Sequence, residues 1–147
     1  MCRATGELGD AERFDIALHA YRDLLDQNTG SGMLFQPFTL REIELRGLMG
    51  TGRVEEACQI VYRQAGRPAA PQWYIIERVT TGEVLAANQD IEGAADAFAD
   101  AIESAERHRL PHQIQRAVRA TAKAGMRDLA DEAKSALQRT RSTLSTR

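Results

Sequence analysis

Small and large apolar residues recur at a helical spacing along this chain, and no other feature limits the fold as strongly. Ala94, Phe98 and Ala101 lie at positions i, i+4 and i+7, so they share one face of a helix. The small residues allow a second helix to approach at both ends, and Phe98 fills the space between. Three further segments share this frame: Ala17/Tyr21/Leu24, Ala57/Val61/Gln64 and Ala130/Lys134/Leu137. Their alanines are separated by 40, 37 and 36 residues, so each interval has room for two helices and two turns, which predicts a stacked array of helix pairs.

Glycines, prolines and polar caps divide the chain into about seven helices. Gly125 ends one helix. Pro37 fits the first turn of a helix, and Pro111 separates two helices. Residues 79–82 (Val-Thr-Thr-Gly) are poor helix formers, so packing must hold their helix together. The predicted helices span residues 10–26, 39–49, 54–64, 72–87, 90–108, 112–124 and 127–139.

The repeated pattern resembles a tetratricopeptide repeat array. The resemblance covers residues 10–139 and rests on Ala94, Phe98 and Ala101, with Gly82 and Leu85 where the family's first helix places a glycine and a large residue. It implies an all-α fold in which antiparallel helix-turn-helix pairs stack in a short right-handed α-solenoid. The first repeat lacks its leading helix. We therefore predict a single domain over residues 1–147, with an N-terminal half-repeat and a flexible basic tail over 140–147.

Residues 106–116 carry a second resemblance. Their sequence, Glu-Arg-His-Arg-Leu-Pro-His-Gln-Ile-Gln-Arg, is similar to a segment of the C-terminal repeat regions of some bacterial helix-turn-helix regulators. That similarity implies a regulatory, ligand-sensing role. The chain itself has no helix-turn-helix with a basic recognition helix, so we expect no direct nucleic-acid binding by it.

Charge is distributed unevenly along the chain. Residues 1–105 hold 9 arginines and 17 acids, a balance of −8, whereas residues 106–147 hold 10 basic and 4 acidic residues, a balance of +6. Such polarity can steer a partner. No apolar run approaches the roughly 18 residues that span a bilayer, and the N-terminus has no secretory apolar stretch. We expect a cytoplasmic protein without membrane contact.

The patterns that could support catalysis or cofactor binding have simpler structural interpretations. Pro111 breaks the helical spacing between His108 and His112 that a metal site would need. Cys58 fits a small buried side chain, and Cys2 lies near an end that we expect to fray. Glu55 and its neighbour Glu56 suit the first turn of a helix, and no glycine-rich phosphate loop is present. We therefore expect no enzyme activity, no metal and no cofactor.

A partner-binding groove is the remaining candidate site. In helix-pair arrays the first helix of each pair lines the concave side, and its basic end here would suit an acidic peptide or a terminal carboxylate. One alternative is that these charges only keep a short bundle soluble. Another is a homodimer or larger scaffold built on an uncovered apolar face of Phe14, Leu18 and Tyr21. The predicted groove residues are Glu42, Arg46, Val79, Glu83, His112, Gln115, Arg116, Arg119 and Lys123.

Overall fold

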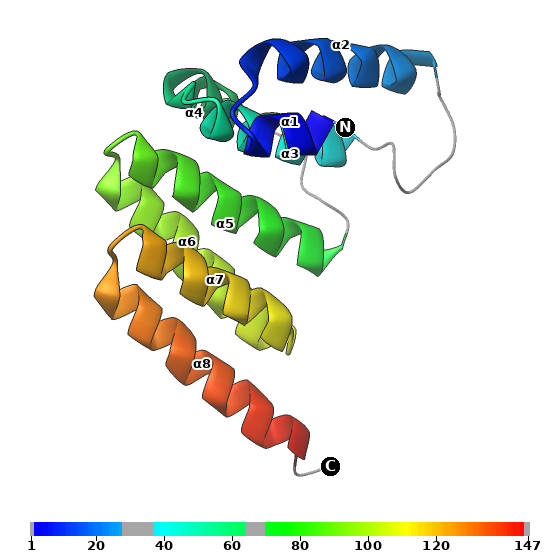
Figure 1. The fold of residues 1–147 in the computed structure, drawn as a ribbon. Coiled ribbons are helices and arrows are strands. Elements are labelled where there is room, and N and C mark those ends of the chain that lie inside the picture. The colour runs from blue at the N-terminus through cyan, green and yellow to red at the C-terminus, as the bar shows by residue number, and fades with distance from the viewer. Residues whose placement is uncertain (1, 28–36, 64–69, 146–147) are drawn as a thin grey trace. The chain divides into compact units, whose positions relative to one another are not determined.

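The protein is entirely helical over the residues that the computed structural model describes, which are 2–27, 37–63 and 70–145 (Figure 1). This confirms the predicted all-α class. Eight helices lie in these ranges, against about seven predicted. They are α1 (Cys2–Glu7), α2 (Ala11–Gln27), α3 (Pro37–Gly50), α4 (Val54–Tyr62), α5 (Pro71–Ala87), α6 (Ile91–Arg107), α7 (Pro111–Lys123) and α8 (Arg127–Ser145).

The chain groups into two compact units, Met1–Arg63 and Gln64–Arg147, and each is described by itself. The sequence predicted a single domain over residues 1–147. The division falls at the start of the segment rich in glycine and proline that precedes α5. Residues 64–69 of that segment, including Gln64 of the repeat frame, lie outside the described ranges.

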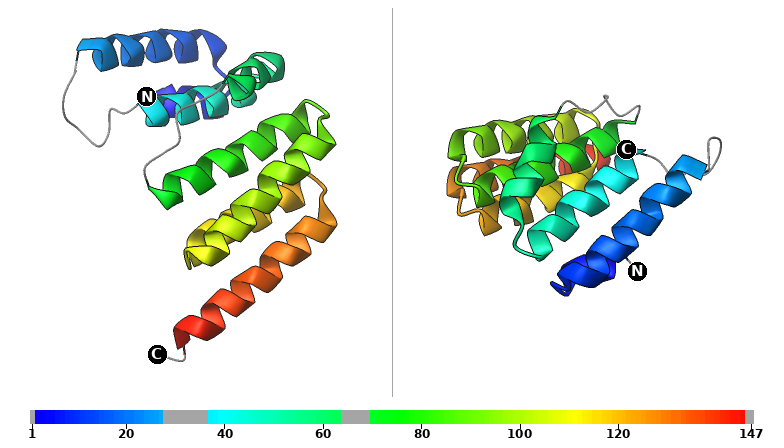
Figure 2. Two further views of the ribbon diagram at one scale, coloured as in Figure 1. Left: turned by 180° about the vertical axis from the view of Figure 1, so that it is seen from behind. Right: turned by 90° about the horizontal axis from the view of Figure 1, so that it is seen from above.

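The second unit consists of α5 to α8, and each helix packs against the next (Figures 1 and 2). α5 also contacts α7, and α6 contacts α8, so alternate helices form two layers. The core is rich in alanine, which lets the helix backbones approach closely. The buried apolar residues of the unit include Ala94, Ala97, Ala101, Ala117, Ala130, Ala133 and Ala136, with Phe98, Ile75, Ile102 and Ile114 among the larger side chains.

The ring of Phe98 lies directly over Gly82, and this contact joins α5 to α6. A Cβ atom built at Gly82 would lie 2.7 Å from ring atoms of Phe98. Burying a side chain of this size stabilises a fold by about 1.5–3 kcal/mol. Residues 79–82 are all buried, so packing holds the helix through the weak helix formers, as predicted. Asp90 caps α6 by accepting a hydrogen bond from the Gly93 N–H at 3.0 Å.

The first unit has a shorter leading helix, and its first three helices all contact one another. α1 packs on α2 and α3, α2 packs on α3, and α3 packs on α4. The prediction that the first repeat lacks its leading helix was wrong, because α1 occupies that place. The expectation of a frayed N-terminus was also wrong for Cys2, whose side chain is only 8% exposed. A six-residue helix is too short to give a clear periodic signal, which is why the sequence did not reveal it.

Five turns between helices share one backbone geometry. At the first of them the Gly9 N–H donates to Gly6 O at 3.1 Å and the Asp10 N–H donates to Thr5 O at 3.0 Å, a Schellman motif. The residue at the equivalent point of each turn has a positive φ, which favours glycine. These residues are Gly9, Gly52, Gln89, Arg109 and Gly125.

The turns correct the repeat frame of the first unit. The buried reference residue follows the positive-φ residue by five positions, as in Gly52 to Ala57 and Gly125 to Ala130. Counting five from Gly9 gives Phe14, not Ala17. Phe14 is fully buried, whereas Ala17 is half-buried and Leu24 is exposed. Alignment on the alanine therefore placed α2 three residues out of phase.

The C-terminal helix is longer than predicted. α8 continues to Ser145 instead of ending at Arg139, and Thr140 is only 3% exposed. The hydroxyl of Thr140 donates to Ala136 O at 2.9 Å, so a residue expected in the flexible tail over 140–147 belongs to the packed helix. Residues 146 and 147 lie outside the described ranges.

Candidate binding surface on helix α7

Helix α7 is fixed by its apolar side and leaves a polar side outward. Pro111 is its first residue, where the missing N–H costs no helical hydrogen bond. Ile114, Ala117 and Ala120 are buried against the neighbouring helices. The hydroxyl of buried Thr121 donates to Ala117 O at 2.8 Å, which satisfies its polar group within the helix.

Four basic side chains follow the outward side of α7. His112, Arg119 and Lys123 are exposed, and Arg116 is half-buried beside them. Their spacing of four, three and four residues places them along one stripe of the helix. α7 contains no aspartate or glutamate. We call His112, Arg116, Arg119 and Lys123 the basic face.

Two glutamines lie at the edges of the basic face. Gln115 is half-buried on the side away from Arg116. Gln113, which was not predicted as a site residue, is only 7% exposed, and its Oε1 accepts no hydrogen bond within the part of the chain that the structure describes. A buried acceptor without a partner costs about 1–3 kcal/mol. The burial of Gln113 results from tertiary packing, and nothing in the local sequence indicates it.

The predicted groove residues of α5 divide into one that is accessible and one that is not. Val79 is 0% exposed, so it belongs to the core and cannot contact a partner. Glu83 is half-buried on α5, which packs against α7. In the frame set by the turns, Glu83 occupies the position that Arg119 has on α7. A ligand on the basic face would therefore have a carboxylate on the neighbouring helix.

The remaining groove candidates, Glu42 and Arg46, lie on α3 in the first unit. Arg46 Nε donates to Glu42 Oε1 at 2.6 Å, so the two side chains pair one helical turn apart. Glu83 and the basic face lie on α5 and α7, two helices of the second unit that pack against each other. α3 belongs to the first unit, which is described by itself, so a groove across all three helices remains a prediction.

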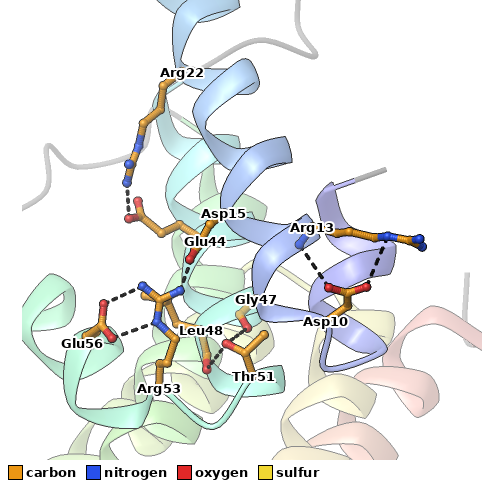
Figure 3. Close-up of polar contacts among 10 residues, drawn as sticks. All are labelled: Asp10, Arg13, Asp15, Arg22, Glu44, Gly47, Leu48, Thr51, Arg53 and Glu56. Atoms are coloured by element: carbon orange, nitrogen blue, oxygen red, sulfur yellow. Dashed lines mark hydrogen bonds and ion pairs between the residues drawn. The ribbon is translucent and has the colours of Figure 1, made fainter.

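An arginine at a turn organises the polar contacts of the first unit (Figure 3). Arg53 Nη1 lies 2.6 Å from Asp15 Oδ1 on α2, and its Nε and Nη2 each lie 2.8 Å from a carboxylate oxygen of Glu56 on α4. The hydrogen bonds that Arg53 donates to Glu56 and Asp15 raise the pKa of Arg53, and the bonds to Glu56 lower the pKa of that carboxyl group. Arg22 pairs with Glu44 nearby. These pairs fit a structural role for Glu56 in the first turn of α4, as expected.

A second polar cluster joins α5 to α6. The hydroxyl of Tyr74 donates to Asp100, and Arg78 Nε lies 2.9 Å from Asp100 Oδ2. Trp73 and Tyr74, next to each other at the start of α5, are both half-buried. The sequence did not indicate the cluster, because its members lie 22 and 26 residues apart.

The histidines and cysteines were the other candidates for chemistry. His108 is the C-terminal cap of α6 and His112 is in the first turn of α7, both exposed. Within the described ranges no three histidine, cysteine or acidic side chains gather closely enough to hold a metal ion. Cys58 is buried, as predicted, and burial raises the pKa of the Cys2 thiol.

The apolar face that was predicted to drive self-association is not open. Phe14 and Leu18 are buried by the helices of their own unit, and Tyr21 is half-buried. The expected surface was assigned on the assumption that no helix precedes α2. α1 and α3 pack against α2, so Phe14 and Leu18 are not open at the surface. Self-association of the chain stays a prediction.

Comparisons with protein-family models, with curated proteins and with solved structures gave no match to this chain. The tetratricopeptide resemblance therefore remains a prediction that rests on the residues that carry it. No described helix is both long enough and apolar enough to cross a membrane.

Proposed function

We propose that this chain is a non-catalytic binding module that holds an acidic peptide segment on the basic face of α7. The observation that carries the proposal is the absence of any carboxylate on α7, together with three exposed basic side chains, His112, Arg119 and Lys123, along one stripe of the helix. The basic face runs from residue 112 to residue 123, about 16 Å of helix, which matches the reach of several residues of extended peptide. Arginine can bind a carboxylate through two parallel N–H bonds, and lysine adds a point charge.

The position of Glu83 narrows the kind of peptide that the basic face would bind. A carboxylate on α5 beside a basic helix disfavours a uniformly acidic ligand, since like charges repel. A peptide with its acids on one side and neutral or amide residues toward α5 would fit better. The half-buried amide of Gln115 can donate to a peptide carbonyl and accept from a peptide N–H.

Binding of a fluorescent peptide tests the proposal. The probe has acidic residues at alternate positions, and a matched probe replaces each acid by its amide. We expect the acidic probe to bind more tightly and to weaken with salt, because exposed charges are screened. Arg119→Glu should weaken binding by about tenfold, since it removes one attraction and adds one repulsion.

Arg141→Glu is the matched control. Arg141 is exposed on α8, and its substitution changes the net charge by the same amount on a different helix. We expect its affinity to stay within about twofold of the native chain. Equal losses from Arg119→Glu and Arg141→Glu would show that only net charge matters, and unchanged affinity in Arg119→Glu would exclude the basic face as the site.

A regulatory setting is the part of the proposal that rests on resemblance alone. It is motivated by residues 106–116, which include the start of the basic face. If the full gene product is a transcription regulator, it should bind DNA through another domain, and the acidic peptide should change that affinity. A full-length product with no DNA affinity in a gel-shift assay would remove this part of the proposal and leave peptide binding intact.

A further inference from the structure

Helix α2 carries apolar side chains on the side that faces away from its own core. Phe14 and Leu18 are buried, whereas Ile16 is 64% exposed, Leu24 is 46% exposed and Ala20 is also exposed. Ile16, Ala20 and Leu24 are spaced by four residues, so they form one continuous stripe over about two turns of helix. We call these three residues the outer stripe.

The outer stripe of α2 is apolar, whereas the outward side of α8, the last helix of the second unit, is polar. α8 exposes Lys134, Ser135 and Gln138, which are polar, as expected for a helix that faces water. Within the described ranges, two of the five exposed large apolar side chains belong to α2. Single exposed apolar residues are common on protein surfaces, but aligned ones on one helix indicate a contact surface.

One edge of the outer stripe is acidic. On a helical wheel, four carboxylates fall on the same side of the stripe, and all four residues are exposed. Asp15 already pairs with Arg53, and Asp23 lies 3.7 Å from His19 Nε2. The opposite edge carries Arg13, which is held by Asp10. The acidic edge consists of Glu12, Asp15, Asp23 and Asp26.

We propose that the outer stripe of α2 docks an amphipathic helix of another protein, one whose apolar residues are bordered by lysine or arginine. Ala20 lies between the larger Ile16 and Leu24, so a bulky side chain of the partner can fit above it. A basic border would then face the acidic edge. This surface belongs to the first unit and is independent of the basic face on α7.

Charge argues against a second copy of α2 as the occupant. In an antiparallel pair related by a two-fold axis, equivalent edges face each other, so the acidic edge would meet its own copy. In a parallel pair the acidic edge would meet an edge with one cation, Arg13, which already pairs with Asp10. Opposed like charges weaken an interface, whereas a basic border removes that repulsion.

Two synthetic helical peptides test the proposal. Both are about 18 residues long, roughly 27 Å as a helix, and carry leucines along one face. One has lysines along the border and the other has glutamates. We expect the full chain to bind the lysine peptide at least about tenfold more tightly in fluorescence anisotropy, with Ile16→Glu and Leu24→Glu each losing about tenfold or more.

Ile91→Glu provides the matched control. Ile91 is 54% exposed, close to Ile16, but lies at the first position of α6 in the second unit. Its substitution should leave the lysine peptide bound as in the native chain. Circular dichroism checks that all three variants keep their helices.

Three results would overturn the proposal. One is equal affinity for the lysine and glutamate peptides at the site that Ile16→Glu disrupts. Another is equal loss of binding in Ile16→Glu and Ile91→Glu. The third is a doubled mass in light scattering that returns to monomer in Ile16→Glu, because a second copy would then be the occupant. The glutamate peptide can also bind to the basic face of α7. Such binding is lost in Arg119→Glu but not in Ile16→Glu, so the two variants distinguish the two sites.

Discussion

A single glycine controls how closely α5 and α6 approach. At Gly82 the absence of a side chain admits the ring of Phe98, and an added Cβ would lie 2.7 Å from two ring atoms. In an isolated helix, alanine is favoured over glycine by about 1 kcal/mol. We expect the opposite sign here: Gly82→Ala should destabilise the fold by about 1–3 kcal/mol, because the ring must leave its position. Urea denaturation followed by circular dichroism measures the change.

A double-mutant cycle identifies the cause of that loss. Phe98→Leu alone should also destabilise, since it leaves part of the buried space empty. Added to Gly82→Ala, however, it relieves the overlap, so the double variant should be more stable than the sum of the two single changes predicts. Additive losses would mean that Gly82 and Phe98 do not interact in this way.

The helices themselves were largely predictable from the sequence, and the misses have physical causes. Caps and breakers such as Asp90, Pro111 and Gly125 act locally, so they fixed most helix ends to within a few residues. The phase of α2 depends on the turn at Gly9, which a match on alanine alone could not reveal. The extension of α8 depends on contacts from residues far away in sequence.

The candidate site was only partly predictable, for a related reason. The basic face could be found because its spacing is a property of one helix. Val79 was assigned to the groove because the pattern of α5 is apolar on several sides and does not distinguish its core from its surface. Gln113 and the Tyr74–Asp100 contact depend on how the helices pack, and no local pattern indicates them.

One ion pair holds the final turns of α8 to α6. Arg139 Nε lies 2.6 Å from Glu106 Oε1, and Nη2 lies 2.8 Å from Oε2, a two-bond contact over 33 residues. The bond from Arg139 lowers the pKa of Glu106. The contribution to stability is therefore present above the unfolded-state pKa and is lost as the pH falls through the lower folded-state pKa.

Removing Arg139 should raise the pKa of Glu106 and loosen the C-terminal end of α8. In Arg139→Gln the pKa of Glu106, measured by carbon NMR of its carboxyl group, should rise toward its ordinary value. Amide exchange near Thr140 should become faster at neutral pH, with little difference from the native chain once the pH lies below the folded-state pKa of Glu106 and its carboxylate is protonated. Lys134→Gln is the control, because Lys134 pairs with Asp131 within α8. A Glu106 pKa that responds equally to both changes would show that the contact with Arg139 is not its cause.

At the scale of the whole molecule, the two units should respond separately to damage in their cores. Each has its own buried aromatic residue over a glycine: Phe14 over Gly47 in the first unit and Phe98 over Gly82 in the second. A Cβ at Gly47 would lie 1.9 Å from Phe14 Cε2, a closer overlap than at Gly82. Gly47→Ala should therefore raise amide exchange in residues 2–27 and 37–63 while residues 70–145 keep their protection. Gly82→Ala should give the reverse pattern, so each variant is the control for the other. Loss of protection in both units from either change would show one cooperative domain, as the sequence predicted, because a unit with an intact core would then depend on its neighbour for stability.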